Sequence, residues 1–133
     1  MKIITLKGKD NSGKTTALRN LYQKFLKMAG TKKINYYHEG ADDSDFTAEL
    51  IVRNNRIVIK SIGDGISWIR DGFQYAQTNN ADVLINAWNS NLDKKYNVQT
   101  ELPGAIVINN PISICAPLQD EWKRFNDDII SRL

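Results

Sequence analysis

The feature that most constrains the fold is the segment GKDNSGKT, Gly8–Thr15, together with the residues on either side of it. The apolar run before it, residues 2–7, predicts a short buried strand. A helix is expected after it, because apolar side chains recur at helical spacing at Leu18, Leu21, Tyr22, Phe25 and Leu26. Gly30 then supplies a helix stop. A glycine-rich turn that joins a strand directly to a helix is typical of a phosphate-binding loop in an α/β domain.

This loop matches G-x-x-x-x-G-K-[ST] at every position, from Gly8 to Thr15. Glycines permit the curvature that turns successive backbone N–H groups toward phosphate oxygens, and the helix that follows directs its positive end at the same anion. Lys14 is expected to reach the β- and γ-phosphates, and the Thr15 hydroxyl to ligate Mg²⁺. We therefore expect nucleotide contacts along the whole segment: Gly8, Lys9, Asp10, Asn11, Ser12, Gly13, Lys14, Thr15 and Thr16.

A second strand and a hairpin are expected in the next part of the chain. Residues 33–38 predict the strand, and the β-prone runs 46–52 and 56–62 surround a polar Asn-Asn pair, which favours a hairpin. The first of these runs also fits a short helix from Asp45 to Leu50, so that alternative stays open.

The second half of the chain continues the alternation of helices and strands. A helix is predicted over Ile66–Thr78, with Ile66, Ile69, Phe73 and Ala76 on one face. Residues 81–88 predict a buried strand and residues 105–109 a last one. The sixteen residues 89–104 between them predict a long loop, of a length that indicates either function or mobility. A closing helix is expected from Pro117, with helical spacing of Leu118, Trp122, Phe125, Ile129 and Leu133.

Strands that alternate with helices predict an α/β fold, with a mainly parallel sheet covered on both faces. The hairpin would contribute one antiparallel strand. The 133 residues contain no linker or internal repeat, so we expect a single domain over residues 1–133. No apolar stretch approaches the roughly 20 residues of a membrane span. The only cysteine, Cys115, excludes an intramolecular disulfide. We therefore expect a cytoplasmic protein with no membrane partner.

The order of strands and helices resembles the P-loop NTPase superfamily over most of the chain, and closely over Gly8–Thr16. As G-x-D-x-S-G-K-T-T, the loop is similar to the thymidylate-kinase type of P-loop. Lys9 stands where the plasmid-partition and nitrogenase-iron-protein type of ATPase carries a lysine that reaches the partner subunit's nucleotide. That type's usual second glycine is replaced here by Asp10. The superfamily resemblance implies a three-layer αβα P-loop domain.

The whole pattern also resembles a group of small bacterial and phage ATP-binding proteins of unassigned role. The matching pieces are Gly8–Thr16, Gly63–Asp64 and Asp82–Ala87. This resemblance implies nucleotide binding and no particular reaction.

Two acids are candidates for catalysis at the carboxyl edge of the sheet, where ligands of parallel α/β sheets bind. Asp64 follows the predicted strand 56–62 directly and is expected to hold Mg²⁺ together with Thr15, or else to cap a helix. Glu39 ends the second strand and is expected to orient an attacking water or an acceptor hydroxyl, or else to be a surface acid. Asp82 begins its strand, which predicts a structural role.

Several other site types are excluded or disfavoured. His38 is the only histidine, so a single chain has no multi-histidine metal site, and Ser113 and Cys115 have no second histidine to form a hydrolase triad. The acidic loop that carries Asp42, Asp43 and Asp45 lacks the glycine and distal glutamate of a calcium loop. The chain also lacks the N-K-x-D of guanine-specific enzymes in the superfamily it resembles, although Asn109 ends a late strand. ATP is therefore the expected nucleotide.

Three functions remain open. The first is an ATPase that dimerises or depends on a partner, with Lys9, Lys14 and Glu39 as catalytic residues. The second is a small nucleotide or small-molecule kinase, which is disfavoured because arginines outside the predicted first helix are scattered and form no lid-like cluster: Arg53, Arg56, Arg70, Arg124 and Arg132. The third is a nucleotide-binding module without turnover. ATP and Mg²⁺ are the expected cofactors, and a homodimer is a candidate assembly.

Charge is distributed unevenly along the chain. Residues 1–33 carry nine Lys and Arg residues against one acid, a formal charge of +8, whereas the remaining hundred carry nine bases and fourteen acids, a formal charge of −5. A basic segment of this kind indicates phosphate binding by its lysines and makes nucleic acid a candidate partner.

Overall fold

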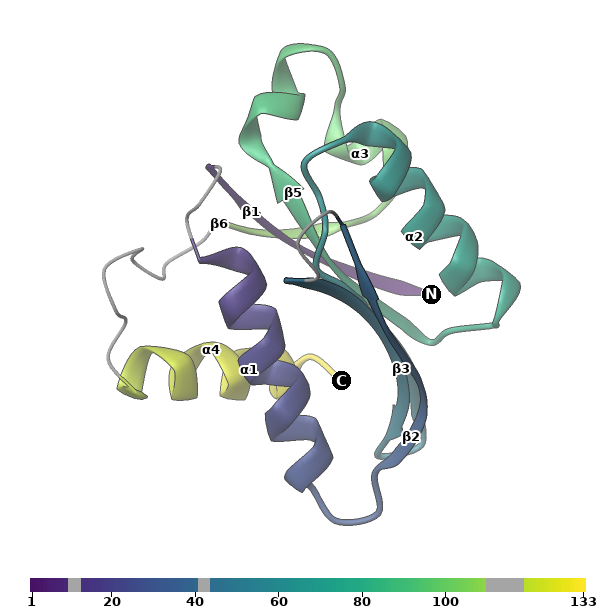
Figure 1. The fold of residues 1–133 in the computed structure, drawn as a ribbon, viewed down its shortest axis with the longest axis vertical. Helices are drawn as coiled ribbons and strands as arrows, with labels where there is room; N and C mark the ends of the chain where they lie inside the picture. Colours follow the sequence, from purple (N-terminus) through teal and green to yellow (C-terminus); the bar gives the residue numbers. More distant parts are fainter. Residues whose placement is uncertain (10–12, 41–43, 110–118) are drawn as a thin grey trace.

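The computed structural model describes residues 1–9, 13–40, 44–109 and 119–133, with the side chains of residues 119–122 left out. Within this part of the chain the strands form one six-stranded sheet of order β2-β3-β4-β5-β1-β6 (Figure 1). The strands are β1 (Lys2–Gly8), β2 (Lys32–Glu39), β3 (Asp45–Val52), β4 (Asn55–Lys60), β5 (Val83–Asn89) and β6 (Ile106–Asn109). The helices are α1 (Lys14–Lys27), α2 (Ile66–Thr78), the 3-10 helix η1 (Ser90–Lys94), α3 (Val98–Glu101) and α4 (Gln119–Ser131).

The sheet is mainly parallel, as predicted. β5 pairs in parallel with β1 and β4, and β6 pairs in parallel with β1. β3 is the antiparallel strand, and it pairs with β2 on one side and β4 on the other. Because β2 and β4 are both antiparallel to β3, they run in the same direction. The carboxyl end of β2 therefore lies at the same edge of the sheet as the phosphate loop.

The predicted hairpin is confirmed, and the alternative of a short helix over Asp45–Leu50 is wrong. β3 and β4 are joined by Arg53 and Asn54, whose φ angles of 50° and 65° match a two-residue turn of the type that suits twisted strands. All residues from Phe46 to Leu50 are buried, because β3 lies inside the sheet. A one-sided helical stripe would leave some of these residues exposed.

Apolar side chains form two clusters, and the helices that contribute to them lie on opposite sides of the sheet (Figure 1). On one side, α1 and α4 bury Leu18, Leu21, Phe25, Phe125 and Ile129 against strand residues such as Ile4 and Leu6. On the other side, α2 and the segment around α3 bury Ile69, Ala76, Val98 and Leu102 against strand residues such as Val58, Leu84 and Trp88. Each fully buried large side chain contributes about 1.5–3 kcal/mol relative to an exposed one.

The helices follow the predicted patterns with small differences. α2 has the predicted bounds, and α1 buries the predicted stripe except Leu26, which is 42% exposed. In α4 the predicted residues Phe125 and Ile129 are buried, and Leu133 packs against the first cluster. The structural predictions for Pro117 and Leu118 lie outside the described residues, as does the one for the side chain of Trp122.

The prediction of a long loop over residues 89–104 is wrong, because the segment contains η1 and α3. Asn89 caps η1 by accepting a hydrogen bond from the backbone of Asn91, and Asn97 caps α3 in the same way through Gln99 and Thr100. Val98 and Leu102 are buried in the second cluster. Short capped helices and buried apolar contacts therefore hold this connection.

No helix among the described residues is long and apolar enough to cross a membrane.

Gly63 allows the segment after β4 to pack against β5. A Cβ atom at this position would lie 2.1 Å from the carbonyl oxygen of Ala87 and 2.5 Å from its carbonyl carbon, both backbone atoms. We expect Gly63→Ala to lower the free energy of unfolding by about 2–4 kcal/mol, since the backbone must move. Urea denaturation measures this loss. Gly65→Ala is the matched control, because its nearest neighbour is a side-chain atom of Trp68 at 3.4 Å. Equal losses in the two variants would contradict the packing argument.

A salt bridge between α2 and α3 predicts a pH-dependent stability. The Arg70 guanidinium donates to both carboxylate oxygens of Glu101, at 3.1 and 2.8 Å, and these hydrogen bonds lower the pKa of Glu101 below its ordinary value of 4.5. A lowered carboxyl pKa contributes stability above the ordinary value, and this contribution is lost as the pH falls through the lowered one. Glu101→Gln is therefore expected to be less stable than the parent at pH 7 and equally stable at strongly acidic pH. Urea midpoints across the pH range, with Arg70→Gln as the matched variant, test this; a pH-independent difference would contradict it.

Candidate active site

The segment predicted to be a phosphate loop connects the carboxyl end of β1 to the beginning of α1, which lie close to each other at one edge of the sheet (Figure 1). Gly13 is the N-cap of α1 with a φ of 87°, a left-handed conformation that favours glycine. Lys14 is 9% exposed, and its Nζ donates to the carbonyl oxygens of Gly8 at 3.1 Å and Lys9 at 2.5 Å. The predicted contact residues Asp10, Asn11 and Ser12 lie outside the described residues. The Lys14 ammonium and the first turn of α1 thus lie at one place, beside the end of β1.

A carboxylate from β3 contacts the beginning of α1. Asp45 Oδ1 accepts hydrogen bonds from the Thr15 hydroxyl and the Ser61 hydroxyl, each at 2.9 Å. Ser61 Oγ in turn accepts a hydrogen bond of 2.8 Å from the backbone N–H of Phe46. These contacts fix Asp45 beside the hydroxyl that the motif assigns to Mg²⁺.

This contact was not predicted from the sequence, in which Asp45 belongs to an acidic loop next to Asp42 and Asp43. The signal lay in the hairpin register. Thr47 pairs with Lys60 across the β3–β4 ladder, and this brings the beginning of β3 next to Ser61. Which of the acids near this loop contacts Thr15 depends on where β3 begins, and composition alone does not give that position.

The predicted metal-linked acid, Asp64, lies at the same edge and is exposed. Gly8 pairs with Asn89, and the Asn89 N–H donates to the Gly63 carbonyl at 2.9 Å, so β5 separates the two segments. Two strand spacings amount to about 10 Å between the backbones of Gly8 and Gly63. Of the two acids, Asp45 contacts Thr15 directly, whereas Asp64 follows β4, two strands from β1 in the sheet.

Glu39, predicted to orient water or an acceptor, lies in a buried ion pair. Its two carboxylate oxygens accept from Lys60 Nζ at 2.9 and 2.6 Å, and the Thr47 hydroxyl also donates to it. The side chains of Lys60 and Glu39 are 6% and 8% exposed. The Lys60 ammonium lies 5.2 Å from the ring centroid of Trp68 in α2. The pair therefore occupies the side of the sheet that α2 covers, opposite the side of α1.

A second polar group lies on the same side of the sheet as this ion pair. Glu49, 3% exposed, accepts hydrogen bonds from Arg56 at 2.5 Å and from the Tyr75 hydroxyl at 2.8 Å. Burial raises the pKa of Tyr75, and the hydrogen bond to Glu49 acts in the same direction, so the hydroxyl remains a donor at neutral pH. These contacts satisfy a carboxylate under α2 and indicate a structural role.

The remaining predicted residues are dispersed. The Lys9 side chain and Thr16 are exposed beside the loop. His38 is exposed on β2, and Asn109 is exposed at the end of β6. The structural role predicted for Asp82 is confirmed, because its carboxylate accepts a hydrogen bond of 2.8 Å from the backbone of Arg56.

The oxygen atoms of Thr15 and Asp45 would suit a metal ion for which the protein supplies only some of the ligands. Within residues 1–9, 13–40, 44–109 and 119–133, no cluster of three or more His, Cys, Asp or Glu side chains could hold a metal. Mg²⁺ is characteristically bound by one or two protein oxygens, with water and phosphate completing its octahedron. A hydroxyl at Thr15 and a carboxylate at Asp45 match that chemistry.

Comparison of the chain with protein-family models, with curated proteins and with solved structures finds no match in any of the three. The functional assignment therefore depends on the residues and contacts described above.

The buried ion pair yields a stability prediction. Glu39→Gln leaves the Lys60 ammonium without its carboxylate, and removal of one partner of a buried ion pair costs about 3–5 kcal/mol. The double variant Glu39→Gln/Lys60→Met removes both charges and is expected to lose less than Glu39→Gln alone. Urea denaturation of the two single variants and the double variant gives the coupling energy. A double variant that loses the sum of the single losses would show that the two side chains do not interact.

Proposed function

We propose that this protein binds a magnesium nucleoside triphosphate, with ATP as the expected nucleotide, and hydrolyses it. The observation that carries the proposal is the hydrogen bond between Thr15 and Asp45, next to Lys14 at the beginning of α1. A match to the sequence motif alone would indicate only a phosphate-binding loop. Here a carboxylate that the motif does not contain lies 2.9 Å from the hydroxyl that the motif assigns to the metal.

The arrangement of the elements supports a three-layer P-loop domain. α1 and α4 pack on one side of the sheet, and α2 and α3 on the other. The loop itself lies at the carboxyl edge of parallel strands, the position at which α/β sheets bind ligands.

Each described residue of the loop has a defined role in this proposal. Lys14 exchanges the Gly8 and Lys9 carbonyls for β- and γ-phosphate oxygens, so the buried ammonium retains anionic or polar partners throughout. The N–H groups at the beginning of α1 donate to the same phosphates. Bound Mg²⁺ would neutralise charge that develops on the phosphate oxygens. Thr15 provides one ligand to it, and Asp45, oriented by Ser61, accepts from a metal-bound water or binds directly.

Catalysis also needs a group that orients water and a cation near the γ-phosphate. Asp64 is exposed at the correct edge, next to Gly63, whose backbone lies about 10 Å from that of Gly8 by strand spacing, and we assign it a contact with the phosphates through water. Glu39 is not assigned this role, because it would first have to leave Lys60. Arg19 of α1 donates to the Ser44 carbonyl and lies over the Phe46 ring. We therefore assign the additional cation to the exposed Lys9 of a second copy or to a partner, which makes turnover dependent on assembly.

ATP binding and Mg²⁺-dependent phosphate release test this proposal. Lys14→Ala is expected to abolish both. Asp45→Asn is expected to lower kcat at least a hundredfold, because metal positioning acts on the transition state. Asp64→Asn is expected to lower kcat by less than that. Asp127→Asn is the matched control, the same change at an exposed position on α4. Specific activity is expected to rise with protein concentration.

Other outcomes would overturn particular parts of the proposal. ADP that forms only after addition of a nucleoside monophosphate or another acceptor would replace hydrolysis with phosphoryl transfer to that acceptor. ATP binding without turnover at any protein concentration would leave a binding module. Asp45→Asn with unchanged kcat would remove Asp45 from the metal site. Absence of ATP and GTP binding would overturn the proposal as a whole.

A further inference from the structure

Apart from the exposed Lys9, the lysines of the first third of the chain divide into two groups in the structure. One group has internal partners: Lys14 contacts the phosphate loop, Lys7 pairs with Asp93, and Lys2 donates to the Arg132 carbonyl. The lysines of the other group are all exposed and lie at the end of α1 and the beginning of β2: Lys24, Lys27, Lys32 and Lys33. Together with Tyr36 and His38 we call this second group the α1–β2 surface. It contains much of the positive charge of the N-terminal third.

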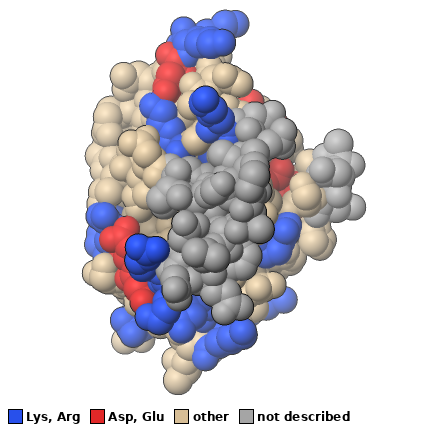
Figure 2. Space-filling view, turned by 90° about the vertical axis from the view of Figure 1, so that its left-hand side faces the viewer, with Lys and Arg blue, Asp and Glu red and all other residues tan. Residues whose placement is uncertain are grey.

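The lysines of this surface lie at the end of the molecule away from Thr15, and Tyr36 and His38 follow them along β2 toward the carboxyl edge of the sheet. Figure 2 shows Lys and Arg side chains gathered at the lower end of the molecule, where α1 ends in Figure 1, with acidic side chains beside them. Lys27 and Lys32 form no ion pair within the described residues. One neighbouring acid, Asp127, interacts mainly with Lys123. A hydrogen bond from Lys123 lowers the pKa of Asp127, and Lys24 adds a smaller effect in the same direction.

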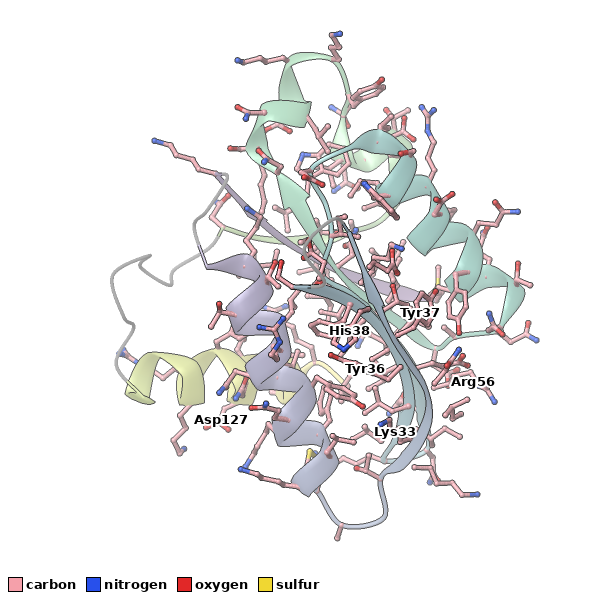
Figure 3. The ribbon with its side chains drawn as sticks, in the orientation of Figure 1. Lys33, Tyr36, Tyr37, His38, Arg56 and Asp127 are labelled. Carbon is pink, nitrogen blue, oxygen red and sulfur yellow. The ribbon has the colours of Figure 1, made fainter. Side chains whose placement is uncertain are left out.

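A β-bulge places three of these side chains on one face of β2. Lys33 pairs with Leu50, but Asn35 pairs with the next residue, Glu49, so one residue is inserted between them. Lys33 therefore lies on the same face as Tyr36 and His38, whose partners are Ala48 and Phe46. Figure 3 shows Lys33, Tyr36 and His38 along β2 on the side toward α1, with Tyr37 on the other side. Without the bulge, strand alternation would place Lys33 on the opposite face.

Tyr36 lies between the other two side chains and is near both. The Lys33 ammonium lies 5.5 Å from the ring centroid of Tyr36, and the His38 ring meets Tyr36 edge-on at 5.3 Å. Tyr36 is supported from behind, because it stacks on Tyr22 at 5.1 Å and on Phe46 at 5.5 Å. The result is a half-buried ring on a rigid base, an exposed imidazole beside it, and cations at its rim.

Two structural explanations account for part of this surface. Lys24 and Lys27 complement the dipole at the end of α1, and Lys32 and Lys33 protect the open edge of β2 from pairing with other chains. Neither explanation requires a supported aromatic ring between the cations. Nor does either require the bulge that brings Lys33 onto the face of that ring.

We propose that the α1–β2 surface binds single-stranded nucleic acid. Lysines at the rim bind backbone phosphates, and Tyr36 and His38 stack with unpaired bases, the combination that sequence-tolerant single-strand binding uses. A duplex hides its base faces inside the stack, so it would use the cations alone. The only acid of β2, Glu39, is on the opposite face in its ion pair with Lys60, so it does not repel phosphates here. This proposal is independent of nucleotide hydrolysis.

Fluorescence anisotropy of the full chain with labelled oligo-dT, oligo-U and a duplex of equal length tests the proposal. We expect tighter binding of the single strands. Lys27→Glu/Lys33→Glu is expected to raise the Kd for oligo-dT at least tenfold. Loss of two phosphate contacts is also expected to shrink the slope of log K against log salt by about 1.4. His38→Ala is expected to raise the Kd about fivefold without changing this slope, since stacking carries no charge. Lys94→Glu/Lys95→Glu, at exposed lysines near η1, is the matched control and is expected to bind as the parent does.

Each alternative role of the α1–β2 surface predicts a different experimental result. Equal losses in the two double variants, equal or tighter binding of the duplex, or no binding of any oligonucleotide would overturn the proposal. Binding to phosphatidylserine vesicles, with no binding to oligonucleotides, would assign the surface to membranes instead. Self-association of Lys27→Glu/Lys33→Glu with unchanged oligonucleotide affinity would leave protection of the β2 edge as the role of these lysines. Circular dichroism shows whether the double variant folds. If it does not, the anisotropy of the single variants Lys33→Gln and His38→Ala tests the proposal instead.

Discussion

The site depends on the carboxylate of Asp45, which joins three segments that are distant in sequence. It accepts from Thr15 at the beginning of α1 and from Ser61 after β4, while Asp45 itself begins β3. Because one oxygen receives both hydroxyls, their positions relative to each other are fixed. The phosphate loop is thereby held against the hairpin β3–β4 as well as against its own strand. For the proposed function, a loop held in this way before the ligand binds would need less reorganisation when phosphate and metal enter, which is the physical basis of preorganised electrostatic catalysis.

The sheet separates two kinds of polar chemistry onto its two sides. On the side of α1 lie Lys14 and Thr15, with partners that a ligand can replace. On the side of α2 lie the ion pair Glu39–Lys60 and the carboxylate of Glu49. Glu49 accepts hydrogen bonds from the side chains of Arg56 and Tyr75. Buried ion pairs add little net stability but are costly to break. Such pairs therefore fix which residues of β2, β3 and β4 face α2, and the position of Asp45 follows from that register.

The success of sequence-based prediction followed the range of the interaction concerned. The strand and the helix on either side of the glycine-rich segment, the bounds of α2 and the hairpin turn at Asn54 were predictable, because each depends on a local pattern. The contact between Asp45 and Thr15 was not, since it depends on the pairing of β3 with β4. The same holds for Glu39, whose partner Lys60 lies two strands away. The short helices in residues 89–104 had a local signal in the caps Asn89 and Asn97, but a loop rich in polar residues concealed it.

β2 connects the two functional regions, because its ends lie at opposite edges of the sheet. Its amino end carries Lys32 and Lys33, and its carboxyl end pairs with the residue that contacts the phosphate loop, Glu39 with Asp45. β2 is an edge strand, held on one side only by β3. A ligand that shifts β2 along β3 would therefore strain the ion pair of Glu39 and the register at Asp45 together. Cores and ladders have discrete arrangements, so small displacements of this kind are resisted until the register changes as a unit. The Glu39–Lys60 pair opposes that change, and its burial makes the resistance strong.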